Sequence, residues 1–171
     1  MSTYKTVKIK KYSDIIEEYT ANAAITPGHL IEEMSTGKVR VHANAGKDVT
    51  PPMFALEDEL QGGGIDTAYS AGNRVQCWIP GRGDQVYALL ADGEIVVVGD
   101  ALVSAGDGTL KKDQKTYESW ESADANPGGG QRSIYTNRIV GIALEAKNLK
   151  GSGSDSSAGG AYYPRIKVRI V

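Results

Sequence analysis

Residues Arg74–Leu110 read RVQCWIPGRGDQVYALLADGEIVVVGDALVSAGDGTL. Short runs rich in valine, isoleucine and tyrosine alternate here with turns built from glycine and aspartate, which is typical of antiparallel strands joined by hairpins. Glycine supplies a positive φ at low cost, and aspartate accepts hydrogen bonds from nearby backbone N–H groups. The segment therefore predicts strands at NRVQCWIP, QVYALLA and EIVVVG, and it assigns the Gly–Asp pairs to turns rather than to chemistry.

The same pattern extends toward the N-terminus. Strands are predicted at Leu30–Met34 and Lys38–His42 around a tight turn at Ser35–Gly37, and a further strand at Met53–Glu57 follows a Pro-Pro pair. Proline at a strand start is tolerated because its missing N–H removes no ladder hydrogen bond there. These regular intervals favour a mainly β protein with a small β-barrel or β-sandwich-like body of the β-tulip type.

Toward the C-terminus a strong strand is predicted at Ile139–Ala146. The final run PRIKVRIV alternates cleanly, with Ile166, Val168 and Ile170 on one face. Such regular alternation predicts a half-buried strand, which we expect to close the barrel. Two polar stretches, 111–133 and the Gly/Ser-rich 151–161, are expected to be loop excursions of one domain spanning residues 26–171.

Residues 1–25 are expected to form an extended arm and a connector. Ser2–Lys11 alternates lysine with threonine, valine and isoleucine. Two interpretations stay open: an ordinary solvated first strand, or an arm that orders only by adding a strand to a partner sheet. The connector Asp14–Ala24 places two isoleucines and a tyrosine on one side of a short predicted helical turn.

Composition narrows the function classes. The 171 residues carry a net charge of −2, so no global positive field attracts nucleic acid. No apolar run approaches the length of a membrane span, and the N-terminus lacks the apolar core of a signal peptide. We therefore expect synthesis in a cytoplasm. The single cysteine, Cys77, lies in an alternating run and is expected to be a small buried hydrophobe.

Candidate catalytic and metal-binding groups are sparse. The two histidines, His29 and His42, have no cysteine or acidic partner at ligand spacing, and no calcium loop or phosphate loop motif occurs. A Ser-His-Asp triad is spatial, so counting residues leaves it open, but no GxSxG elbow supports one. The GRGD tetrapeptide at Gly81–Asp84 is expected to be a hairpin tip. We expect neither an enzyme, nor a cofactor, nor a metal site.

Four motifs stand in the middle of the chain: FALED (Phe54–Asp58), IDTAYSAGNRV (Ile65–Val75), GDQVYALLADG (Gly83–Gly93) and VGDALVSAGDGTL (Val98–Leu110). Together they resemble the core of the capsid decoration, or cement, proteins of tailed phages. PGHLIE and VHANAG, upstream, extend the resemblance over roughly the middle half of the chain.

The resemblance implies a role similar to that of the phage lambda head decoration protein. Such proteins sit on the outer surface of the expanded head and bridge neighbouring major capsid subunits, often as trimers. The resemblance implies a homotrimer that binds the major capsid protein and binds neither nucleic acid nor a membrane. It further implies capsid binding by the N-terminal arm, through Tyr4, Lys5, Val7, Lys8, Ile9, Lys10 and Tyr12.

Two alternatives come from other function classes. The first is a different phage structural β-protein, such as a tail-tube, head-completion or fibre-base component. The second is an enzyme or a small-molecule-binding barrel, which requires a concave pocket with convergent polar groups.

Overall fold

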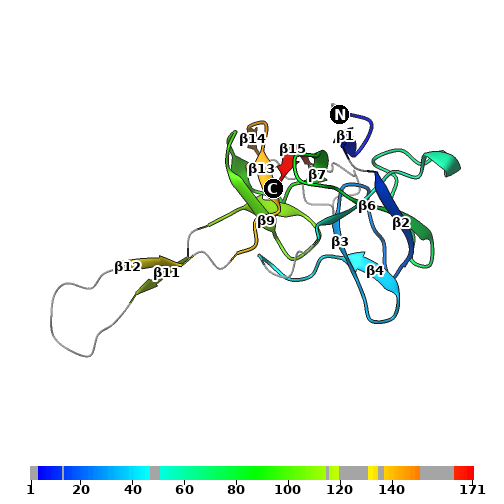
Figure 1. The fold of residues 1–171 in the computed structure, drawn as a ribbon, viewed down its shortest axis with the longest axis horizontal. Helices are drawn as coiled ribbons and strands as arrows, with labels where there is room; N and C mark the ends of the chain where they lie inside the picture. Colours follow the sequence, from blue (N-terminus) through cyan, green and yellow to red (C-terminus); the bar gives the residue numbers. More distant parts are fainter. Residues whose placement is uncertain are drawn as a thin grey trace.

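The computed structural model describes residues 4–12, 14–46, 51–114, 116–119, 131–134, 137–150 and 164–171. A closed five-stranded barrel lies beside a six-stranded antiparallel sheet (Figure 1). The predicted mainly β body with a small barrel is therefore confirmed.

The barrel strands follow the order β2-β4-β3-β5-β6. β2 pairs with β4 in parallel, and the other barrel pairs are antiparallel. The strands span Ile15–Ala21 (β2), Leu30–Glu33 (β3), Lys38–Val41 (β4), Met53–Ala55 (β5) and Arg74–Ile79 (β6).

The six-stranded sheet follows the order β1-β7-β15-β13-β9-β10. Its strands are Lys8–Lys10 (β1), Gln85–Leu89 (β7), Ala101–Ser104 (β9), Leu110–Lys112 (β10), Gly141–Ala143 (β13) and Arg165–Ile170 (β15). The C-terminal strand β15 was expected to close the barrel. It lies instead inside this sheet, between β7 and β13, because alternation shows that a strand is half-buried and not which sheet it joins.

Smaller elements complete the described fold. β8 (Ile95–Val96) pairs with β14 (Lys147–Asn148), and a short 3-10 helix η1 spans Glu59–Gln61. β11 (Thr116–Ser119) pairs with β12 (Gln131–Ile134) in a hairpin that projects from the body (Figure 1). The excursion expected at 111–133 thus contains strand β10 and this hairpin rather than loop alone. The run 151–161 falls outside the described residues.

Two hydrophobic cores result from strict alternation along the barrel strands. One set of side chains fills the barrel, and the neighbouring set faces the six-stranded sheet. The barrel interior takes Ile31, Val39, Ala55, Val75 and Cys77. The layer between barrel and sheet takes Leu30, Phe54, Trp78, Val86, Leu102, Ile166 and Val168.

Two predictions of secondary structure require correction. The helical turn expected at Asp14–Ala24 is replaced by β2, because its backbone pairs along its length with β6. The strand expected at EIVVVG stops after Val96. The carboxylate of Asp100 accepts the backbone N–H of Val97 at 2.9 Å, and this bond turns the chain.

The Gly–Asp pairs act in turns, as predicted. In the β9–β10 turn, Asp107 accepts the backbone N–H of Thr109 at 2.9 Å. Gly108 adopts a φ of +81°, and a Cβ there would lie 2.8 Å from Cβ of Val41. Its backbone approaches the barrel closely, since the Leu30 N–H donates to its carbonyl at 2.8 Å. This turn therefore fastens the sheet to the barrel.

Candidate functional site

The N-terminal segment, expected to be an arm, is built into the body. Val7 is fully buried, and its carbonyl accepts the backbone N–H of Tyr87 at 2.8 Å. The Val7 N–H donates to Oε2 of Glu57 at 3.0 Å, and the ring of Tyr4 meets that of Tyr87 edge-on at 5.0 Å. A segment with these contacts belongs to the chain's own fold.

Of the other residues predicted for the arm, some contact the body and the rest are exposed to solvent. Ile9 is partly buried against the core, and Lys8 forms an ion pair with Asp14 at 3.6 Å. Lys5, Lys10 and Tyr12 are exposed. Three of the seven predicted residues thus lie on the edge strand β1 and the other four flank it, and several of them support the core.

β1 and β2 together follow one continuous partner segment. Lys8 pairs with Val86 and Ile15 pairs with Ile79. The register shifts within β1, because Lys10 pairs with Gln85, one position away from where the Lys8–Val86 pair would place it. β4 pairs only with the end of β2, at Thr20–Ala21. The outer edge of β1 and of residues 15–18, termed here the β1–β2 edge, therefore has no strand beside it in the described part of the chain.

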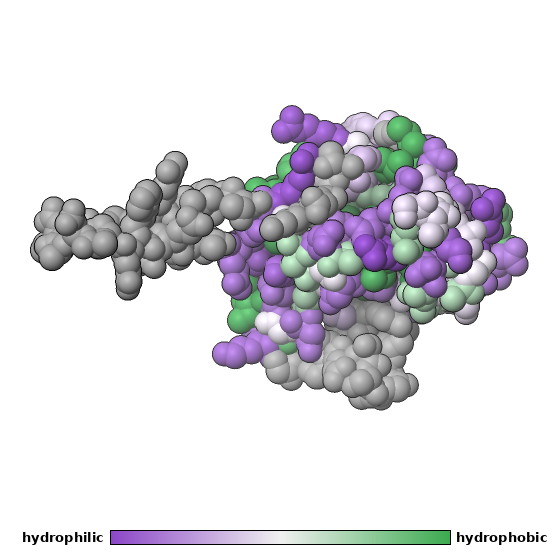
Figure 2. Space-filling model, turned by 90° about the horizontal axis from the view of Figure 1, so that it is seen from below, coloured by the Kyte–Doolittle hydropathy of each residue, from purple (hydrophilic) through white to green (hydrophobic). Residues whose placement is uncertain are grey.

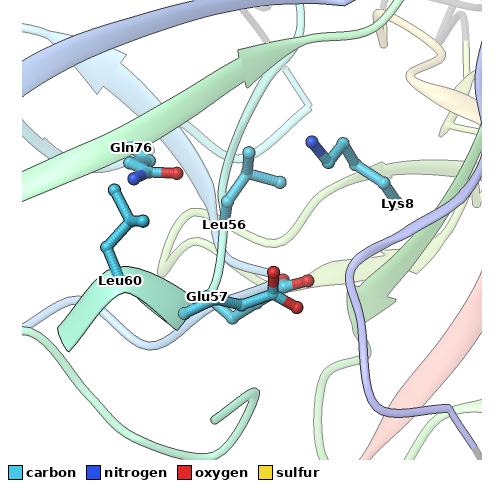
Figure 3. A pocket seen from close by; sticks show the side chains of 6 residues that line it. Lys8, Leu56, Glu57, Leu60 and Gln76 are labelled. Carbon is cyan, nitrogen blue, oxygen red and sulfur yellow. The ribbon is translucent and has the colours of Figure 1, made fainter. Parts of the chain in front are cut away.

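A pocket of about 270 Å³ opens where β1 approaches β6. The Lys8 side chain enters it from one side, and Leu60 and Gln76 flank it from the other, with Leu56 between them (Figure 3). Its Glu57 carboxylate is already bonded to Thr6 and Val7. The lining thus combines the apolar side chains of Leu56 and Leu60 with the Lys8 ammonium, the carboxylates of Glu57 and Glu59, and the Gln76 amide.

Large apolar side chains are exposed on β8 and the turn that follows it. Ile95, Val97 and Val98 are 48%, 53% and 64% exposed. The turn is held by Asp100, which also pairs with Lys112 at 2.9 Å. These three side chains, termed here the β8 patch, form a fixed apolar surface that the sequence prediction assigned to a strand.

The GRGD sequence is a structural turn. Asp84 is fully buried, and its carboxylate accepts the backbone N–H groups of Gly81 at 2.8 Å and Tyr12 at 2.5 Å. Because Asp84 is fully buried, its carboxylate is not presented to another protein at the surface. Asp84 instead ties the β6–β7 turn to the bend between β1 and β2.

The structure brings a serine, a histidine and a glutamate together, a grouping that sequence spacing did not indicate. His42 Nδ1 lies 2.8 Å from Ser104 Oγ, and its Nε2 lies 3.7 Å from an Oε2 oxygen of Glu32. Ser104 is fully buried and His42 is 1% exposed. The cluster fastens strand β9 to the barrel, and its serine oxygen is shielded from any substrate.

The other candidate groups are also structural. His29 Nδ1 accepts the backbone N–H of Thr26 at 3.0 Å, and burial lowers the pKa of His29 to about 4. The Cys77 thiol is buried, as predicted, and burial raises its pKa to about 12. Within the described residues, His, Cys, Asp and Glu side chains form no group that could hold a metal ion.

The surface view agrees with a polar exterior interrupted by apolar groups. Figure 2 shows one face on which hydrophilic residues predominate and hydrophobic ones are interspersed. Among the described residues, no helix is long and apolar enough to span a membrane.

Comparison with solved structures finds chains of similar fold. No protein-family model and no curated protein matches the chain. The fold is similar to the N base of head fibre gp8.5 in bacteriophage phi29, with a TM-score of 0.48 and 14% identity over 93% of this chain and 95% of that chain. At this level of similarity the match carries no argument about function.

Proposed function

We propose that this chain is a structural protein of a phage virion that decorates the outside of the expanded head and bridges neighbouring major capsid subunits. In this proposal the chain performs no catalysis. Sequence motifs between Phe54 and Leu110 support the assignment through their resemblance to cement proteins.

The β8 patch is the observation that carries the proposal. Soluble monomers rarely expose contiguous apolar patches unless these contact a partner. Val97 and Val98 lie next to each other on a turn held by Asp100, so their burial against a shell costs little ordering entropy. The turn also lies within, or directly beside, the motif that carries the resemblance.

The buried polar groups support a structural role in a second way. Glu57, Asp84 and Ser104 each bond to main-chain or side-chain groups of segments distant in the sequence. Arg165 donates to the carbonyl of Pro27 at 3.0 Å and to that of Ile65. These contacts stiffen a small body, which suits a protein that has to resist distortion of a shell.

Binding of V97D/V98D to expanded heads that lack the protein tests the proposal. Burying two carboxylates against an apolar surface is costly, so we expect apparent affinity to fall by about tenfold or more. The matched control is Leu60→Asp, since Leu60 is 85% exposed and lies on η1, away from the patch. Unchanged binding of the double variant, with its fold verified by thermal melting, contradicts the assignment of the patch.

A further inference from the structure

Aspartate followed by glycine occurs twice in the chain, at Asp92–Gly93 and at Asp107–Gly108. In this dipeptide the backbone nitrogen of the glycine can attack the side-chain carbonyl carbon of the aspartate, because glycine has no Cβ to hinder the approach. The product is isoaspartate, in which the main chain runs through the aspartate side chain. The two pairs lie in turns with different surroundings, and these surroundings distinguish them chemically.

The Asp92–Gly93 pair lies in the turn between β7 and β8, and both residues are exposed. The Gly93 N–H donates to Oδ1 of Asp92 at 2.8 Å. This contact holds the attacking nitrogen beside the carboxyl group whose carbon it has to reach. Gly93 has a φ of +75°, and a Cβ added to it would meet nothing within 4 Å, so the turn has room to change shape as a ring closes.

The Asp107–Gly108 pair is held by the fold on both sides of the bond that would react. The Asp107 carboxylate accepts the N–H and the hydroxyl of Thr109 at 2.9 and 2.5 Å. Gly108 is buried; its N–H donates to the His42 carbonyl at 3.1 Å, and its carbonyl accepts the Leu30 N–H at 2.8 Å. Before it could attack, the Gly108 nitrogen would have to leave His42 and the turn would have to leave the barrel.

We propose that Asp92 is a site of spontaneous isomerisation to isoaspartate in the folded chain, and that the fold protects Asp107 from the same reaction. In the first step the Gly93 nitrogen bonds to Cγ of Asp92. The proton of that nitrogen, one carboxylate oxygen and one proton from solvent leave as water, and a succinimide ring results.

The second step consumes the water that the first step released. Water adds to the main-chain carbonyl carbon of Asp92, and the bond from this carbon to the Gly93 nitrogen breaks. The nitrogen regains a proton, and the former carbonyl becomes a free carboxylate that releases a proton to solvent. The reaction therefore needs no oxidant, reductant or co-reactant other than water.

Isomerisation adds the side-chain methylene group of Asp92 to the main chain of this turn. The chain is held on both sides of it, since the Ala91 N–H donates to the Leu110 carbonyl at 2.8 Å and the Glu94 carbonyl accepts the Leu149 N–H at 2.9 Å. The added length is therefore taken up at the exposed Asp92 and Gly93. The inference concerns the free chain and does not rest on the proposed function.

Peptide mapping of the folded full chain, incubated for weeks at physiological temperature and pH, tests the inference. Electron-transfer fragmentation in the mass spectrometer distinguishes isoaspartate from aspartate. We expect isoaspartate to accumulate at residue 92 at least about tenfold faster than at residue 107, because reaction at Asp107 requires local opening of its turn. Synthetic peptides spanning 88–97 and 103–112 are the control, and we expect them to isomerise at similar rates.

Asp92→Glu is the matched variant. Glutamate keeps the charge, but its longer side chain would have to close a larger ring, so we expect this variant to form no isoaspartate at residue 92 and to react at residue 107 as the original chain does. Three results overturn the inference: equal accumulation at the two positions of the folded chain, a rate at residue 92 slowed relative to its peptide as much as that at residue 107, or a signal that persists in D92E.

Discussion

The backbone N–H of Tyr12 donates a hydrogen bond to Oδ1 of Asp84, and this contact joins the bend between β1 and β2 to the turn between β6 and β7. The same carboxylate accepts the N–H of Gly81 at 2.8 Å, and the Asp84 carbonyl accepts the N–H of Ile170 at 3.0 Å. One buried residue therefore connects the N-terminal strands, a central turn and the C-terminal strand.

Replacing Asp84 by alanine is expected to lower the free energy of unfolding by about 3 kcal/mol, because two backbone donors lose a charged acceptor in a buried site. Urea denaturation followed by tryptophan fluorescence measures the loss. Asp92→Ala provides the comparison, since Asp92 is exposed and accepts the N–H of the neighbouring Gly93 in a turn. A loss no larger for D84A than for D92A contradicts the role assigned to Asp84.

Replacing Arg165 by lysine is expected to cost about 2 to 3 kcal/mol of stability. Lysine keeps the charge but lacks the planar fork that reaches the carbonyls of Pro27 and Ile65. Asp66→Asn is the control, because the Asp66 carboxylate is 53% exposed and its ion pair with Arg165 contributes less than about 1 kcal/mol. If D66N lowers the free energy of unfolding as much as R165K does, then the ion pair with Asp66, and not the contacts with the two carbonyls, is the main stabilising interaction of Arg165.

A comparison of Gly108→Ala with Gly93→Ala separates two costs, that of a side chain at a positive φ and that of a Cβ placed against neighbouring atoms. Both glycines have a positive φ, but a Cβ at Gly93 meets nothing within 4 Å. We expect a cost of about 1 kcal/mol for G93A from the left-handed conformation alone. G108A is expected to cost about 3 kcal/mol, since its Cβ also crowds Val41 and the carbonyl of Leu30. Equal melting temperatures for the two variants contradict the docking of this turn on the barrel.

The partly buried His29 is expected to make stability fall with acid. Its pKa is lowered to about 4, chiefly by burial, with Asp107 raising it and Arg165 lowering it. The unfolded chain therefore binds a proton that the folded chain does not between pH 6.5 and 4. The contribution of His29 is complete above pH 6.5 and is lost as pH falls toward 4, by up to about 3 kcal/mol.

His29→Asn isolates this effect, because asparagine offers an acceptor to the Thr26 N–H but does not titrate. When both unfolding free energies are measured from pH 7 to 4, that of the original chain is expected to fall more steeply than that of the variant. Parallel pH curves would show that other groups, such as carboxylates, cause the acid sensitivity.

Much of the fold was predictable where alternation is uninterrupted. β6 and β15 follow the predicted inward faces, with Val75, Cys77, Ile166 and Val168 all buried. The helical turn predicted at Asp14–Ala24 was wrong for a physical reason. The spacing of Ile15, Ile16 and Tyr19 also suits a helix, and only pairing with a distant strand makes this segment β2.

The candidate surfaces were less predictable. The run EIVVVG suggested burial, yet a side chain–backbone bond from Asp100 turns Val97 and Val98 outward. The Ser104–His42 contact joins residues far apart in the chain, and no local pattern signals it.

Titration of the full chain onto expanded and unexpanded heads of a phage that lacks it, measured by co-sedimentation, tests the decoration proposal most directly. The account predicts saturable binding to expanded heads, reduced by V97D/V98D, and little binding to unexpanded heads or free capsid subunits. Absence of binding to expanded heads would contradict it and would favour a role elsewhere in the virion.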